Sequence, residues 1–212
     1  LSGNLSTTGS AGITVTNGMQ VSGADRTITS ATGNITLAAV DATGTAYGLT
    51  LTTTSGTINV ARVGGTSALA SLTTSAGGTT NFTGAGVTTT GAQTYNNAVT
   101  LAADNAFTTT NNAILFASTL NSASSTPRAL TANAGTSTIT FTGAVGGAQG
   151  LGNISLTSTG TTTISSAVNA ASLTQNSITG TTAINGGSIT TTGVQAYGNA
   201  ITLGSALTTL TT

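Results

Sequence analysis

Apolar residues in this chain recur in pairs two positions apart, separated mostly by threonine, serine or asparagine. Because successive side chains of a β-strand point to opposite faces, each pair predicts a short strand with one apolar and one polar face. Glycine and asparagine, which tolerate positive φ, stand between the pairs and predict turns. The pairs are Ile13/Val15, Ile35/Leu37, Leu49/Leu51, Ile58/Val60, Val99/Leu101, Ile139/Phe141, Ile154/Leu156 and Ile201/Leu203.

These strands recur with a longer period. Apolar anchors return at intervals of about 18–24 residues, as in the series Ile13, Ile35, Ile58 and Phe82, and periods of this size are typical of repeat proteins with one coil per repeat. A coil of about 20 residues has room for three short strands, and successive coils stack as parallel strands about 4.8 Å apart. We therefore expect an all-β fold, a parallel β-helix (β-solenoid) of about ten coils.

A second, longer repeat divides the chain. The phrase VTTTGAQTYNNAVTLA at 87–102 returns as ITTTGVQAYGNAITLG at 189–204, with ten identities in sixteen positions. The prediction is one continuous solenoid over 1–212. Within it we expect residues 1–25 to be the end of a preceding repeat and residues 26–135 to be a long repeat unit. Residues 136–212 are then a second, truncated unit.

Composition narrows the functional classes. Charged residues make up 3% of the chain, as three arginines and three aspartates, and histidine and cysteine are absent. Three arginines cannot neutralise a run of phosphates, so nucleic-acid binding is not expected. The longest apolar run, AILFA at 113–117, is far shorter than the roughly 18 residues of a membrane-spanning helix, so we do not expect the chain to span a membrane.

Candidate chemistry is sparse. The carboxylates are Asp25, Asp41 and Asp104, and their spacing does not predict a catalytic pair. The glycine-rich stretch at 146–153 lacks the aspartates of a calcium-binding β-roll. The sequence therefore predicts no enzyme, no catalytic, cofactor-binding or metal-binding residues, and no cofactor.

Several charged and aromatic residues, and the single proline, have a predicted structural role. Asp25 and Arg26 form the one adjacent charged pair and predict a solvated turn. Arg62 and Arg128 are expected on loops, the latter beside the single proline, Pro127, which predicts a break in regularity. Two tyrosines in equivalent places of the long repeat, Tyr95 and Tyr197, are expected to pack at a corner.

The segments SLTTSAGGTTNFTGAGVTTTGAQTYNNAVTLAAD (71–104) and SLTQNSITGTTAINGGSITTTGVQAYGNAITLG (172–204) resemble repeats of very large bacterial surface proteins of the filamentous-haemagglutinin type. The resemblance implies a right-handed parallel β-helix exported to the surface of a Gram-negative-type bacterium. It also implies that such a chain serves as an adhesin or a long stalk.

Three functions follow as hypotheses. The first is a structural segment of an extracellular fibre, stalk or sheath, because neither end shows a capping sequence and the low charge favours self-association. The chain starts at Leu1 without methionine, so we expect a fragment or a processed chain. The second is an adhesin that binds surface glycans or host cells. The third is an ice-binding protein, which the lack of one fixed step between Thr-x-Thr patterns disfavours.

Overall fold

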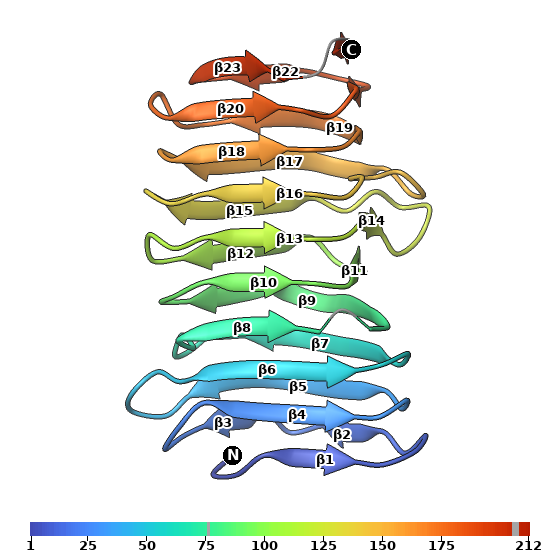
Figure 1. The fold of residues 1–212 in the computed structure, drawn as a ribbon, viewed down its shortest axis with the longest axis vertical. Helices are drawn as coiled ribbons and strands as arrows, with labels where there is room; N and C mark the ends of the chain where they lie inside the picture. Colours follow the sequence, from blue (N-terminus) through green and yellow to red (C-terminus); the bar gives the residue numbers. More distant parts are fainter. Residues whose placement is uncertain (76, 205–207) are drawn as a thin grey trace.

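The computed structural model describes residues 1–75, 77–204 and 208–212. The chain winds into a parallel β-solenoid with the two termini at opposite ends (Figure 1), as the period of the sequence predicted. The front strands run left to right and the rear strands right to left as the chain climbs, which makes the coil right-handed (Figure 1). Within the described ranges every regular element is a strand and none is a helix.

One side of the coil is a parallel sheet of ten strands, drawn at the front of Figure 1. Successive coils contribute one strand each, and every strand between the first and the last pairs in parallel with the strand of the coil before and the coil after. In order they are β1 (Leu5–Thr7), β4 (Arg26–Ser30), β6 (Gly48–Thr53), β8 (Ser71–Thr74), β10 (Gln93–Tyr95), β13 (Ile114–Phe116), β16 (Ile139–Phe141), β18 (Thr161–Ile164), β20 (Thr181–Ile184) and β23 (Ala200–Leu203).

The rest of each coil belongs to a fourteen-stranded sheet. Some coils cross it as two short strands and others as one long strand, so that β2 and β3 both pair with β5, and β11 and β12 both pair with β9. Its strands are β2 (Ile13–Val15), β3 (Met19–Val21), β5 (Ile35–Ala42), β7 (Thr57–Val63), β9 (Thr79–Thr89), β11 (Ala98–Leu101), β12 (Asn105–Thr109), β14 (Leu120–Ser122), β15 (Leu130–Gly135), β17 (Leu151–Ser158), β19 (Val168–Gln175), β21 (Ser188–Thr191), β22 (Gln195–Tyr197) and β24 (Thr209–Thr211).

Coil length varies while the pairing register is kept. The ten-stranded sheet rises through nine turns from Leu5 to Leu203, close to the ten coils predicted. The shortest turn, from Ile184 to Leu203, takes 19 residues, and the longest, from Phe116 to Phe141, takes 25. The longest turn contains the exposed loop 123–127, which ends at Pro127, so extra residues leave the coil instead of shifting the strands.

The core is a column of side chains stacked along the axis. Phe82, Tyr95, Phe107, Phe116 and Phe141 come from successive coils and lie fully or almost fully buried, with neighbouring ring centroids 5.0–5.4 Å apart. Tyr95 and Phe141 stack on opposite faces of Phe116, while Phe82 and Phe107 meet their neighbours edge to face. Such contacts contribute roughly 0.5–1.5 kcal/mol each beyond burial, so the middle of the solenoid is its best-packed part.

Several predictions from the apolar pattern need correction. Ile201 and Leu203 are 39% and 57% exposed because they lie on the last full coil, with no further strand over them. The predicted series of anchors placed Phe82 next to Ile58 in one column. In the structure Phe82 pairs with Val60, and Ile58 pairs with a threonine, so the series is wrong by two residues at that coil. Arg62 lies within strand β7 and not on a loop.

Candidate functional site

Two of the three carboxylates, Asp25 and Asp104, lie in loops immediately before a strand, and Asp41 lies within strand β5. Asp25 Oδ1 accepts a hydrogen bond of 2.8 Å from the backbone N–H of Gly48, one coil further on. Asp104 Oδ1 accepts one of 2.9 Å from the N–H of Ala129 in the same way. Each carboxylate satisfies a backbone donor that the turn leaves unpaired, and asparagines such as Asn34 do the same elsewhere.

Asp41 is the most enclosed of the three and forms the one ion pair found among the described residues. Its Oδ1 accepts from the N–H groups of Thr66 and Ser67 at 2.7 and 3.1 Å, and its Oδ2 lies 3.5 Å from Arg62 Nη2. Burial raises its pKa, while the two backbone donors and Arg62 lower it, and the net result is a pKa below its ordinary value. The group is therefore a stable carboxylate and a poor general acid.

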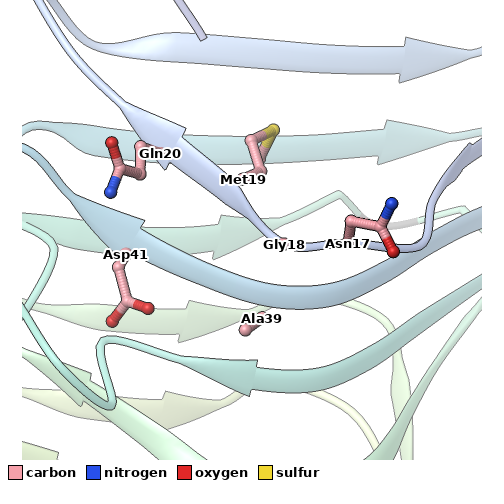
Figure 2. A pocket seen from close by; sticks show the side chains of 6 residues that line it. All are labelled: Asn17, Gly18, Met19, Gln20, Ala39 and Asp41. Carbon is pink, nitrogen blue, oxygen red and sulfur yellow. The ribbon is translucent and has the colours of Figure 1, made fainter.

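A shallow depression of about 330 Å³ lies beside this carboxylate (Figure 2). Asn17, Gly18, Met19, Gln20, Ala39 and Asp41 line it. In Figure 2 the polar side chains of Asn17, Gln20 and Asp41 point in different directions and do not converge on one point. Gln20 Oε1 is already engaged by the Thr43 hydroxyl at 2.7 Å. The depression thus offers no set of groups arranged around a substrate.

The remaining arginines support the ends of loops. Arg26 begins strand β4, and its side chain donates to the backbone carbonyls of Leu1, Asp25 and Ser22, so the predicted solvated pair is in fact bonded to the chain around it. Arg128 lies on the loop before β15, as predicted, and its backbone N–H donates to Ser122 Oγ at 2.9 Å.

A buried polar network surrounds Gln93, and the sequence pattern alone did not indicate it. Gln93 Nε2 donates to the carbonyl oxygens of Val87 and Thr108 at 3.2 and 2.9 Å and lies 3.2 Å from Thr89 Oγ1. Tyr95 completes it by donating its hydroxyl to Gln93 Oε1 at 3.0 Å. Tyr95 is packed, as predicted, but it lies within strand β10 and points into the core instead of sitting at a corner, and burial raises the pKa of its hydroxyl well above the ordinary value.

The second copy of the long repeat rebuilds the same network. Gln195 Nε2 donates to the carbonyl oxygens of Ile189 and Thr211 at 3.1 and 2.8 Å and lies 3.3 Å from Thr191 Oγ1. Tyr197 donates to Gln195 Oε1 at 3.1 Å. Tyr197 is only half-buried, and burial raises its pKa to about 12. The recurring residues of the repeat are therefore explained by an internal hydrogen-bond network.

The two copies nevertheless lie on different sheets. Gln93 belongs to β10 of the ten-stranded sheet, whereas Gln195 belongs to β22, which pairs with β19 of the fourteen-stranded sheet. Gln93 and Gln195 are 102 residues apart. Four turns of the ten-stranded sheet lead from Gln93 to Thr182 and use 89 of these residues. The remaining 13 residues cover about two-thirds of the next turn, which is 19 residues long, so Gln195 reaches a different side of the coil. The network therefore depends on the local coil and not on one particular sheet.

Among the described residues no three acidic, histidine or cysteine side chains gather where they could hold a metal ion. In the same part of the chain, no helix is long and apolar enough to cross a lipid bilayer. Each carboxylate accepts hydrogen bonds from the backbone of the next coil. Among the described residues, Asn105 Oδ1, Arg128 Nε and Asn199 Nδ2 are buried without a hydrogen-bond partner.

Comparisons of the chain with models of protein families, with curated proteins and with solved structures found no match. The class of protein therefore follows from the fold itself. The chain is a repeat protein of the parallel β-solenoid class, in which each coil rests on the previous one.

Proposed function

We propose that this chain is a non-catalytic structural segment of an extracellular fibre, stalk or sheath of the bacterial surface. In this role β-coils stack along one axis, through continuation of the chain or docking of copies. The extracellular location and the kinship with filamentous-haemagglutinin-type proteins rest on the sequence resemblance. The observation that carries the structural role is the unbroken parallel stacking of coils from Leu5 to Leu203, in which each coil pairs with the next along one axis.

At the C-terminal end, the last coils leave apolar side chains exposed. Val194, Ile201, Leu203 and Leu210 are 66%, 39%, 57% and 44% exposed, although the pair equivalent to Ile201 and Leu203 in the first repeat is buried. Strand β23 has a partner on one side only, so its other edge presents unpaired backbone groups. This end is ready to accept another parallel strand.

At the N-terminal end, the opposite edge is available. Strand β1 pairs only with β4, and its Leu5 is partly buried against the core together with Ile13, Val15 and Met19 of the same coil. The two ends expose complementary donor and acceptor rows of a parallel sheet. A head-to-tail contact between copies therefore generates an open filament and not a closed dimer.

Dilution of the purified chain tests this role. We expect sedimentation to show concentration-dependent association, and electron microscopy to show unbranched rods whose lengths differ by multiples of about 48 Å, ten strand spacings of about 4.8 Å. The change Leu203→Lys places a charge on the stacking edge and should shift the material to single rods. Thr131→Lys, on an exposed site in the middle of the solenoid, is the matched control and should leave association unchanged.

A chain that stays monomeric at every concentration would contradict the docking of copies. Association that Thr131→Lys and Leu203→Lys weaken equally would contradict the role of the stacking edge. Binding of the monomer to immobilised glycans without any filament would favour the adhesin instead.

A further inference from the structure

The outer face of the ten-stranded sheet carries a column of threonines. In nine consecutive coils, one outward-facing residue of the strand pairs in register with its counterpart on the strand of the next coil. Seven of these nine residues are threonine. The column is Thr27, Thr50, Thr73, Thr94, Leu115, Thr140, Thr163, Ala183 and Thr202.

A second column runs beside the first, two residues further along each strand. Backbone hydrogen bonds such as Ser75 N–H to Leu51 O and Thr142 N–H to Phe116 O keep these residues in the same parallel register. The second column also contains hydroxyl groups at Thr29, Thr52, Ser75, Thr142 and Ser165. Three coils thus present a Thr-x-Thr pair on one face, and two more present a Thr-x-Ser pair.

These threonine hydroxyls have no hydrogen-bond partner within the part of the protein that the structure describes. This holds for ten of them: Thr27, Thr29, Thr50, Thr52, Thr73, Thr94, Thr140, Thr142, Thr163 and Thr202. On the fourteen-stranded sheet, by contrast, outward side chains such as Asn59, Asn81 and Thr100 bond to one another. These ten threonine hydroxyls are therefore free to bond to something outside the protein, whereas the Ser75 hydroxyl is bonded to the backbone of Thr53.

The geometry of this face restricts what that partner can be. Hydroxyls repeat at about 4.8 Å along the axis and at roughly 6.7 Å along each strand, because these are the spacings of adjacent strands and of alternate residues. Neither column contains a charged residue. The ten strands run side by side and in the same direction in one continuous sheet (Figure 1), so both columns lie on the same face. The partner must therefore be neutral, periodic and rich in hydrogen-bonding groups.

We propose that this face is an ice-binding site, with the ordered water of an ice crystal as its ligand. The threonine methyl groups confine water between the columns, while the hydroxyls hold it by hydrogen bonds at near-lattice spacing. The variable spacing of threonines along the chain does not oppose this, because corners and loops absorb the differences in coil length. Strand register, and not sequence spacing, sets the array.

A crystalline polysaccharide is the main competing partner of similar chemistry. Proteins that bind sugars usually offer exposed aromatic rings, and the aromatic residues of these strands, Tyr95, Phe116 and Phe141, all point into the core. The two columns contain no aromatic residue. The observations therefore favour ice. The coils with Leu115 and Ala183 interrupt the first column and leave its longest continuous run at Thr27–Thr94.

The test compares three forms of the chain for thermal hysteresis and for adsorption to a growing ice hemisphere. Wild type should show both. The double change Thr50→Tyr with Thr73→Tyr places bulky rings in the middle of the longest run and should abolish both. Thr36→Tyr makes the same substitution at an outward position of β5 in the other sheet and should leave both unchanged. Far-UV circular dichroism verifies that all three forms keep the β-solenoid.

If the double tyrosine variant does not fold, Thr50→Val with Thr73→Val removes the hydroxyls while keeping the shape, and it should weaken thermal hysteresis severalfold. Absence of thermal hysteresis in wild type overturns the proposal. So does equal loss in Thr36→Tyr, or binding to crystalline cellulose or chitin without binding to ice. None of these readouts depends on filament formation, so this inference and the structural role fail independently.

Discussion

Replacing Gln93 with leucine should open the middle of the solenoid far more than the same change at Gln195. Both glutamines hold the same network, although on different sheets, and their burial differs: Gln93 is fully buried, whereas Gln195 is partly buried near the C-terminal end. The change removes the acceptor of the Tyr95 hydroxyl and the donor of two carbonyl groups. The comparison therefore isolates the cost of leaving polar groups unpaired in the core.

The magnitude follows from what each change leaves behind. A buried hydroxyl without a partner costs about 1–3 kcal/mol, and the lost bonds to the carbonyls of Val87 and Thr108 add about 1 kcal/mol together, because both carbonyls keep a lone pair for the strand ladder. We expect Gln93→Leu to destabilise its coil by about 3 kcal/mol, which is more than a hundredfold in the opening equilibrium. At Gln195 water replaces the lost partner, and the cost should stay below about 1 kcal/mol.

Amide hydrogen exchange is the appropriate assay, because coils of a repeat protein can open separately and one global unfolding energy then misses the local effect. Peptides that cover 87–116 should lose protection in Gln93→Leu. Adding Tyr95→Phe removes the orphaned hydroxyl and should restore part of the loss, since replacing both partners by apolar groups is close to neutral. Equal losses in Gln93→Leu and Gln195→Leu, or no recovery in the double variant, would refute the reasoning.

Three further predictions concern packing and ionisation. Phe107→Ala removes a ring that contacts three others at 5.1–5.4 Å and should cost about 3–5 kcal/mol in urea unfolding, whereas Thr131→Ala on the surface should change stability by less than about 0.5 kcal/mol. Because the pKa of Asp41 in the folded state lies below its ordinary 3.8, the stability that Asp41 adds is present above that value and is lost as pH falls through the folded pKa. The Asp41→Asn variant keeps an acceptor oxygen that does not titrate, so the melting temperature of this variant should fall less in acid than that of the wild type. In an ultraviolet titration Tyr197 should ionise near pH 12 and Tyr95 only on unfolding; ionisation of both together would contradict the difference in burial.

The sequence by itself determined the fold class. Alternation of apolar and polar residues fixes which side of each strand faces inward, and glycine and asparagine mark where the chain can turn. Those two local rules, with a period near 20 residues, leave stacked parallel coils as the arrangement that buries the apolar side. The side chains that the alternation placed inside, such as Leu51 and Ile58, are buried as expected.

Only the tertiary structure decided how the coils align. Coil lengths run from 19 to 25 residues, so the spacing of apolar residues alone does not tell which side chains share a column: Phe82 lies in the column of Val60 and not of Ile58. Loop residues that leave the coil cannot be told from residues that lengthen it until the strands pair. For that reason the threonine columns, the aromatic stack and the placement of the second repeat on another sheet follow from strand register, which is a property of long-range backbone hydrogen bonds.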